Sequence, residues 1–438
     1  MSFLRKLSIY GLIFLSLIAL FIGVLTLSAA LPKNRSFVKN IRYSAKHLHE
    51  EKDWPNVGGV KLDNYTDSLI LNVCFTFDSS SPLKSALNPG YAYPASEEPG
   101  ISGVHYLNVL VSDNRPEMKY YSYRRYWFGH SAVMKILFYF ANLKKIQTSV
   151  GFITLLLLFM CCIRVLKNDG MVPALALFSL LGFCCIHVFF LSLQYYPVIW
   201  IGLIGLLILD KFSCPGSRGP VFFSLGMLTA YFDLLTAPVL SFGIPAMVIC
   251  GRDAAKEEKA GNNSRKTWFR IWFGYPAAWL AGYIISWGTK ILLGVLSGGT
   301  WTEIIQQILL RSGNTFEGKK ITMLDALQQN FRNITSDSSL VLILVLCWFV
   351  YFLIRRLIEW KQGKLYFSLR IMSGYLVLML MPLAVIILMP NHTYQHAYMT
   401  FRGLALTFAA LFMSLTAFQP VVKHCEKQAT SSGTADCA

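Results

Sequence analysis

Apolar runs that approach or reach the length of a membrane span recur along this chain, and they constrain its fold more than any other feature. A spanning helix needs about 20 mainly apolar residues. Ten spans are predicted, several of them short: 7–31, 150–165, 171–193, 198–208, 221–235, 238–250, 271–287, 340–353, 371–389 and 401–418. Because the bilayer core offers no water to exposed backbone groups, such runs fold as helices. The sequence predicts an all-α polytopic membrane protein.

Composition excludes the water-soluble classes. Hydrophobic residues make up 54% of the chain and charged residues 14%, whereas about a quarter of a soluble globular chain is charged. The formal net charge of +17 would suggest nucleic acid as a partner of a soluble protein. Here the Lys and Arg residues sit in short loops between apolar runs, which is typical of membrane orientation. We therefore expect membrane lipids, and no nucleic acid, among the partners.

The first apolar run could be a signal peptide or a retained helix. Arg5 and Lys6 precede it, as in either case. Its core, from Leu7 to Leu31, is longer than the roughly 7 to 15 apolar residues of a signal peptide and is close to a full span. We interpret it as a retained first transmembrane helix.

The distribution of basic residues predicts the topology. With the N-terminus inside, alternate loops collect the Lys and Arg residues, as the positive-inside rule requires, and both termini are cytoplasmic. The predicted organisation is a first transmembrane helix (1–31), an extracytoplasmic loop (32–149), helices 2–7 (150–290), a second extracytoplasmic loop (291–338), helices 8–10 (339–420) and a cytoplasmic tail (421–438).

Candidate functional residues come from distant parts of the chain but share the outer side of this topology. Ionisable groups within membrane segments are expensive unless they face a cavity or a partner. The first loop contributes Asp63, Asp67, Arg124, Arg125, Trp127 and His130, two spans contribute His187 and Asp233 in their outer halves, and the start of the last span contributes His392, His396 and Arg402. No single motif among them is specific. Their shared position on the outer side, at similar depth, is stronger evidence for a functional site than any one motif.

Each candidate also has a purely structural interpretation. Asp63 precedes a helix-compatible stretch and could be its N-cap, and Asp233 could be a hydrogen-bonded helix end before Pro238. His187 could be a satisfied interior histidine. Arg124 and Arg125, among Tyr and Trp, could belong to an interfacial belt that anchors the loop. The i, i+4 spacing of two further histidines, His392 and His396, could suit a metal, but there is no third ligand or HExxH pattern.

Together these residue types suit the transfer of a sugar. A carboxylate can act as general base toward a sugar hydroxyl that attacks an anomeric carbon. Arginine matches the geometry of a departing phosphate and offsets its charge. Aromatic residues around Arg124 and Arg125 suit stacking on sugar faces or the depth of lipid head groups. No nucleotide-binding glycine motif is present in the loop 252–270, which argues against a nucleotide donor.

At this point the chain resembles the GT-C superfamily of integral membrane glycosyltransferases. The acidic stretch Asp63-Asn-Tyr-Thr-Asp67 resembles the family's acidic motif in the first loop, and the segment 130–145 resembles its amphipathic surface helix before the second span. Asp63 follows the first span by more residues than in many family members.

The resemblance implies a polyprenyl-phosphate-sugar donor, a glycan or lipid acceptor and inverting hexosyl or pentosyl transfer, with no cofactor. Of the ten cysteines only Cys74 lies in the first loop, so no outer disulfide framework is available, and this favours a bacterial inner membrane. It also implies Asp63 as the base with Asp67 second, Arg124, Arg125 and Arg402 on the donor phosphate, and His392 and His396 on phosphate or acceptor. Because few outer carboxylates are available as ligands, no metal is expected.

Two other function classes stay open. A transporter or flippase of lipid-linked saccharides could line its pathway with Asp233 and His187, although such proteins often show internal repeats, and none is visible in the hydrophobic pattern. A non-catalytic assembly or receptor protein would use the long loop for binding. The outer segment 298–337, with two helical patterns around a turn, could be a lid over the acceptor site or a structural cover.

Overall fold

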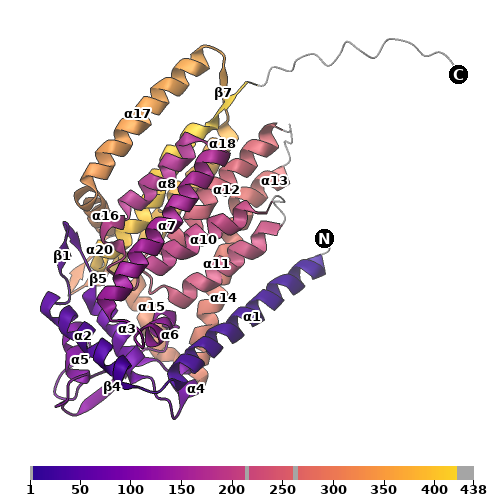
Figure 1. Ribbon diagram of the computed structural model, residues 1–438. Coiled ribbons are helices and arrows are strands. Elements are labelled where there is room, and N and C mark those ends of the chain that lie inside the picture. Colours follow the sequence, from indigo (N-terminus) through magenta and orange to yellow (C-terminus); the bar gives the residue numbers. More distant parts are fainter. Residues whose placement is uncertain (1–2, 213–216, 260–264, 422–438) are drawn as a thin grey trace, which may run out of the picture.

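The chain folds into a helical bundle capped at one end by the first loop (Figure 1). The computed structural model describes residues 3–212, 217–259 and 265–421. Within these residues, six segments are long and apolar enough to cross a membrane: Leu7–Ala30, Leu143–Asp169, Arg270–Leu296, Ser339–Lys361, Leu369–Leu388 and Ala397–Ala417. The prediction of a helical, multi-pass membrane protein is confirmed to this extent.

The bundle is built from helices that run roughly side by side in Figure 1. They are α7 (Leu143–Asp169), α8 (Met171–Phe183), α10 (Tyr196–Asp210), α11 (Arg218–Phe232), α12 (Val239–Lys259), α14 (Tyr275–Leu296), α18 (Leu369–Leu388) and α21 (Ala405–Met413). The short π-helix η2 (Arg270–Gly274) leads into α14 from α13 (Arg265–Phe269), and 3-10 turns η3 (Phe401–Leu404) and η4 (Ser414–Ala417) flank α21.

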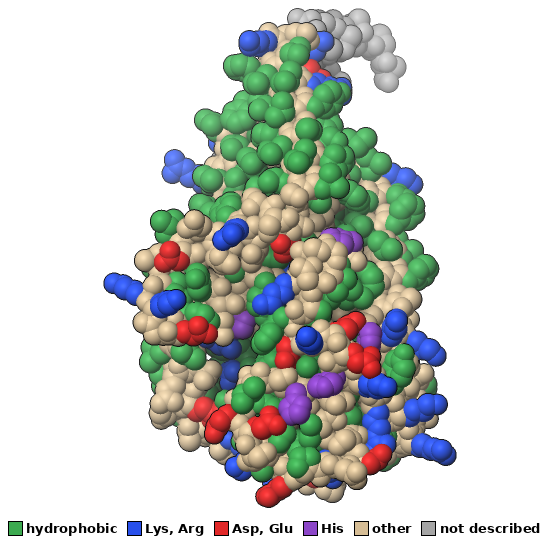
Figure 2. Space-filling view, turned by 90° about the vertical axis from the view of Figure 1, so that its left-hand side faces the viewer, with side chains coloured by type: hydrophobic (Ala, Val, Ile, Leu, Met, Phe, Trp, Pro, Cys, Tyr) green, Lys and Arg blue, Asp and Glu red, His purple; other side chains and the backbone are tan. Residues whose placement is uncertain are grey.

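Two helices flank the bundle and are mostly exposed. These are α1 (Phe3–Ala30) and α17 (Ser339–Lys361), and Figure 1 draws them splayed away from the central helices. Only 6% of the α17 span is buried, against 78% of the span 397–417. Figure 2 shows apolar side chains gathered over the upper part of the face that contains α17, with charged side chains and histidines mixed over the lower part. The exposed apolar surface is what a lipid-facing helix requires.

The first loop is a folded layer at the end of the bundle. Its helices are α2 (Arg35–Glu51), α3 (Asn64–Thr76), α4 (Pro82–Leu87), α5 (Gly103–Leu110) and α6 (Gly129–Leu137). Two antiparallel ribbons accompany them: β1 (Asn56–Val57) with β2 (Val60–Lys61), and β3 (Gly90–Pro94) with β4 (Met118–Ser122), in which Gly90 pairs with Ser122. Buried side chains of the layer, such as Phe37 and Ile70, share one continuous core with the bundle.

The second outer segment is also folded. It contains α15 (Trp301–Ser312), the ribbon of β5 (Thr315–Phe316) and β6 (Lys319–Lys320), and α16 (Met323–Asp337). After α18 the chain forms α19 (Pro390–Gln395) and α20 (Ala397–Thr400). At the opposite end, β7 (Leu365–Phe367) pairs with β8 (Phe418–Pro420), and of the predicted tail 421–438 only Val421 lies within the described residues.

Side-chain caps set where several of these helices begin. Asp63 accepts the Thr66 N–H at 2.9 Å and begins α3, and Asn142 accepts the Lys145 N–H at 3.1 Å and begins α7. Thr322 and Asp325 form a complete capping box at α16. Such caps satisfy backbone donors that the first helical turn leaves unpaired.

Two predicted helices are wrong in their extent. The predicted span 171–193 stops at Phe183, because Cys185 adopts a left-handed conformation (φ 57°) and the chain turns through α9 (Ile186–Phe189) instead of continuing. The predicted surface helix 130–145 is two helices, α6 and α7, since the Asn142 cap starts a new one. His187 is therefore an exposed residue of a short helix and not part of a long span.

Close contact between α11 and α14 depends on glycine. A Cβ atom on Gly226 of α11 would lie 2.0 Å from the Trp279 carbonyl oxygen, and one on Gly282 of α14 would lie 2.1 Å from the Phe223 carbonyl oxygen. The two backbones thus touch reciprocally, as small residues allow in membrane helix pairs. On the same helix α14, a Cβ on Gly288 would meet nothing within 4 Å.

We expect Gly282→Ala to destabilise the protein by about 1–3 kcal/mol, because the added methyl group pushes the two backbones apart. Gly288→Ala is the matched control on α14, and it should leave the melting temperature unchanged or raise it, since alanine favours a helix. Thermal unfolding of both variants in detergent measures the difference. Equal melting temperatures would contradict the close crossing.

Candidate functional site

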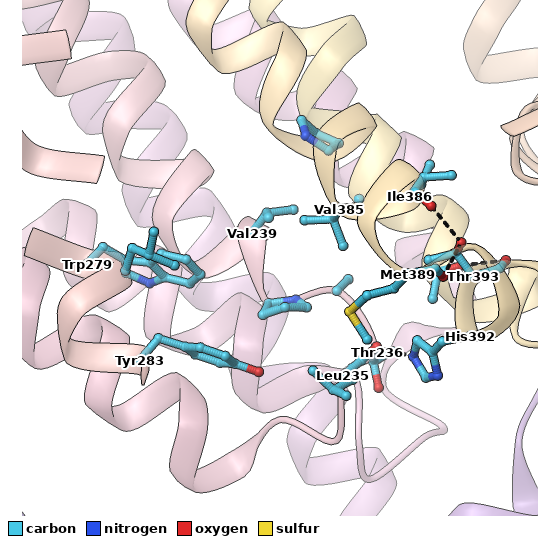
Figure 3. Close-up of a pocket in the computed structure, with 16 residues that line it drawn as sticks. Leu235, Thr236, Val239, Trp279, Tyr283, Val385, Ile386, Met389, His392 and Thr393 are labelled. Carbon is cyan, nitrogen blue, oxygen red and sulfur yellow. Dashed lines mark hydrogen bonds between the residues drawn. The ribbon is translucent and has the colours of Figure 1, made fainter. Parts of the chain in front are cut away.

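An apolar cavity of about 150 Å³ lies between α14 and α18, near the end of the bundle that the first loop covers. In Figure 3, Trp279 and Tyr283 of α14 face Val385 and Ile386 of α18, and Met389 just after it, across the cavity. The 235–239 segment completes the wall, and His392 and Thr393 lie at one end. An apolar cavity of this size holds a benzene-sized group, so it fits one segment of a lipid chain.

His392 joins this cavity to a cation. Its Nδ1 lies 2.7 Å from Nη1 of Arg311 on α15, and its Nε2 lies 2.9 Å from the Leu235 carbonyl oxygen. A guanidinium can only donate, so Nδ1 accepts from Arg311 and Nε2 donates to the carbonyl, which requires a neutral ring. Burial, together with the nearby His396 and Arg311, holds the pKa of His392 well below its usual value.

His396 and Lys61 extend the cluster toward the first loop. The His396 ring lies 4.8 Å from the His392 ring between centroids, and its Nδ1 has no hydrogen-bond partner among the described residues. Burial lowers the pKa of His396 to about 4, helped by Arg311 and Lys61. Lys61 Nζ lies 4.5 Å from the centroid of the Tyr398 ring. The fixed positive charges here thus come from Arg311 and Lys61.

The carboxyl group of Asp63 lies beside this cluster and is 1% exposed. Besides the capping bond, its Oδ2 accepts from Thr66 Oγ1 at 2.8 Å, Gln194 Nε2 at 2.9 Å and the Tyr398 hydroxyl at 3.5 Å. Burial raises the pKa of Asp63, and the hydrogen bonds oppose that rise. The N-cap interpretation is confirmed, and the same carboxyl contacts side chains from two other parts of the chain.

Asp67 lies one helical turn further along α3 and is fully buried. Both of its carboxyl oxygens lie 3.0 Å from the backbone nitrogen of Leu193, and Oδ1 also accepts from Ser192 Oγ at 3.2 Å. Burial raises its pKa well above the usual value. Its contacts hold the turn between α9 and α10 against the first loop.

Asp233 belongs to the same network as Asp63. It follows α11, where its carboxyl accepts the backbone N–H groups of Leu235 and Thr236 at 2.9 and 3.0 Å and the Tyr283 hydroxyl at 3.4 Å. Thr236 Oγ1 donates to Gln194 Oε1 at 3.1 Å, and Gln194 in turn donates to Asp63. Because Thr236 and Tyr283 line the cavity, this network runs from Asp63 to the cavity wall.

Arg124 and Arg125 lie at the junction of the first loop with α14 and α15. The Arg125 guanidinium lies 3.9 Å from the Tyr123 ring centroid and 5.5 Å from that of Tyr126, and Arg311 lies 6.0 Å from the same Tyr126 ring. Arg125 Nε has no partner among the described residues. Arg124 and Arg125 also line a small separate pocket with Gly299 and Glu303. Arg125 thus shares an aromatic neighbour with Arg311, and both Arg124 and Arg125 lie beside the start of α15.

Arg402 is fully buried and is bound mainly to backbone. Its Nε donates to the Cys184 carbonyl at 3.2 Å and its Nη1 to the Tyr398 carbonyl at 2.9 Å. The guanidinium lies 4.2 Å from the Tyr195 ring centroid, while Nη2 has no partner among the described residues. It lines a small pocket with Gln194 and Thr236, two residues of the network that links Asp63 to the cavity.

Three predicted site residues lie apart from this cluster. Trp127 is 1% exposed and donates to the Ser286 carbonyl at 3.1 Å, beside Phe21. His130 is buried against Phe232, and burial lowers its pKa to about 3. Exposed His187 lies next to Gly58 in the β1–β2 turn. Trp127 and His130 pack inside the protein, and no hydrogen bond, ion pair or ring contact among the described residues joins any of the three to Arg311 or His392.

Sequence reasoning missed Arg311, Lys61, Gln194, Tyr283 and Tyr398. Arg311 lies in the last turn of α15, an amphipathic helix of the second outer segment, where a single basic residue is ordinary. Gln194 directly follows the predicted span 171–193, and Tyr398 lies two residues after the predicted site residue His396. Their positions near the outer ends of predicted spans were the available signal. Arg311 belongs to the second outer segment and forms a hydrogen bond with His392. This contact places part of that segment at the cluster, as the lid interpretation requires.

Among residues 3–212, 217–259 and 265–421, no group of three or more His, Cys, Asp or Glu is arranged to hold a metal ion. The chain was also compared with known proteins. No family model, no curated protein and no solved structure matches it.

Proposed function

We propose that this protein is a glycosyltransferase of the bacterial inner membrane, with both termini in the cytoplasm. It moves a sugar from a polyprenyl-phosphate carrier to an acceptor glycan or lipid on the extracytoplasmic face. One observation carries the proposal: a buried carboxylate, a cationic cluster and an apolar cavity are joined by direct contacts at one end of the bundle. Such a site suits an amphiphile with an apolar chain and an anionic head.

The donor lipid would bind with its first isoprene units between α14 and α18. Its phosphate would then lie at the His392 end of the cavity, within reach of Arg311. His392 uses its Nδ1 to hold Nη1 of Arg311, which leaves the other donors of the guanidinium to phosphate oxygens. Arg125, beside the same Tyr126 ring, would be the second phosphate ligand. Arg402 would act on the site indirectly through the Tyr398 backbone.

Asp63 would act as the general base. Its carboxylate removes the proton from an acceptor hydroxyl, the hydroxyl oxygen forms a bond to the anomeric carbon, and the bond from that carbon to the phosphate oxygen breaks. The electron pair leaves with polyprenyl phosphate, whose growing charge Arg311 and Arg125 offset. One displacement of this kind inverts the anomeric configuration. A buried carboxylate is a stronger base than an exposed one.

Asp67 would be a positioning residue, since its carboxyl holds the Leu193 backbone and not a side chain of the cationic cluster. That turn presents Gln194 to Asp63. Trp127, His130 and His187 have no role in the proposed reaction, and Arg124 would shape the α15 side of the site.

The test is sugar transfer by the purified chain in detergent from radiolabelled polyprenyl-phosphate monosaccharides. We expect Asp63→Asn to lower kcat by about 100-fold or more, the usual loss when a general base is removed. Asp67→Asn should lower it far less, because the asparagine oxygen can still accept the Leu193 N–H. Melting temperature and gel filtration check the folding of both variants.

Full activity of a folded Asp63→Asn variant would refute the assignment of the base. No transfer by the wild-type chain from any donor, with translocation of lipid-linked saccharide in liposomes instead, would replace the enzyme with a flippase.

The pH dependence tests the base independently. Because burial raises the pKa of Asp63, kcat/KM should fall as the pH drops through a value above the usual aspartate pKa of about 3.9. The Gln194 hydrogen bond favours the charged form of Asp63. Gln194→Met should therefore move the acid limb of the profile, which is this fall of kcat/KM at low pH, to still higher pH. Rate profiles of both proteins measure the shift. An acid limb that stays in place or moves to lower pH would contradict the role of Asp63.

A further inference from the structure

A second and larger cavity, of about 480 Å³, lies at the opposite end of the bundle from the candidate site. Figure 1 places its elements near β7, where the ends of α17, α18 and α12 meet. The turn between α7 and α8, around Gly170, forms one wall, and the end of α12 forms another. The last turns of α17 and the strand β8 close it. The proposed transfer reaction makes no use of this cavity.

Basic side chains dominate the charge of this cavity. Its lining contains the five cations Arg252, Lys256, Lys259, Arg355 and Arg356, against the single carboxylate of Asp169. Arg252 is already matched, because it forms ion pairs with both Asp169 and Asp210. Arg355 and Arg356 share one carboxylate, that of Glu359, and no ion pair joins Lys256 or Lys259 to another described residue. The cavity therefore has an excess of positive charge.

The rest of the lining mixes apolar residues with a few neutral polar ones, such as Asn168 and Gln419. Met171, Val172 and Pro173 of α8 and Phe352 of the mostly exposed helix α17 belong to its apolar part. Further along, α17 contacts α21 through the ring pairs of Phe349 and Phe352 with Phe412, and most of its remaining surface is exposed. A chain that left the cavity along α17 would thus meet apolar side chains.

We propose that this cavity binds one anionic phospholipid of the adjacent leaflet. Its phosphodiester lies on Lys256, Arg355 and Arg356, and its acyl chains lie along α17 and α8. Basic pockets between membrane helices are suited to anionic head groups, and the apolar wall selects a lipid over a free anion. The lipid fills the gap between α17 and the bundle and thereby ties this outlying helix to it.

The test measures lipid binding by native mass spectrometry of the full-length chain, titrated with phosphatidylglycerol and with phosphatidylcholine. We expect phosphatidylglycerol to bind more tightly to the wild type. The triple variant Lys256→Gln, Arg355→Gln, Arg356→Gln should weaken phosphatidylglycerol binding by about tenfold or more, because each basic residue contributes to attraction of an anionic head group. Arg252 is kept, since its ion pairs join three helices.

The matched control is Lys211→Gln, Lys361→Gln, Lys364→Gln, which removes the same charge from exposed residues that do not line the cavity. It should bind phosphatidylglycerol like the wild type. Equal losses in the two triple variants would show diffuse surface attraction and overturn the proposal, as would equal binding of both lipids by the wild type. Competition by millimolar inorganic phosphate would show an anion site in place of a lipid site. Melting temperatures confirm that each variant is folded.

Discussion

The contact between the start of α3 and the turn before α10 is the constraint on which the rest of this structure depends. Two carboxyl groups, one helical turn apart, are removed from water there. Asp67 accepts the backbone N–H of Leu193, and Asp63 accepts from the side chain of Gln194. A buried carboxylate is costly unless hydrogen bonds compensate it. The first loop must therefore pack on the bundle in an arrangement that keeps these hydrogen bonds. The Asp63 cap fixes where α3 begins, and Gln194 carries the network on to Thr236 and the cavity.

The predictions that the structure confirms concern features that residues close together in the sequence determine. Composition and apolar runs predicted a helical membrane protein because hydrophobic length is a property of the sequence itself. The cap at Asp63 was predictable for the same reason. The break in the helix after Phe183 could not be predicted in this way. It depends on Cys185 in a left-handed conformation and on the hydrogen bond between Leu193 and Asp67, which are more than a hundred residues apart in the sequence. His187 was misplaced as a consequence. Arg311 was missed because its role arises only from a long-range contact with His392.

The two ends of the bundle present two different kinds of cationic site. At the first-loop end, Arg311 and Arg125 lie among aromatic rings and neutral histidines, next to a carboxylate. At the other end, the lysines and arginines line a wider cavity with few matching carboxylates. An enzyme that must hold a phosphate and then release it benefits from the first arrangement, because the charges are few and directed. The second is better suited to a lipid that stays bound.

The position of a bound donor lipid tests the central idea most directly. A photoreactive polyprenyl phosphate, with the reactive group in its first isoprene units, is cross-linked to the purified chain and mapped by peptide sequencing. We expect cross-links to α14 and α18. They should weaken in Val385→Phe, which fills the cavity, and persist in Ala384→Phe, which changes the neighbouring exposed position on the same helix. Cross-links confined to other helices, or equal labelling of both variants, would contradict a donor site at this cavity.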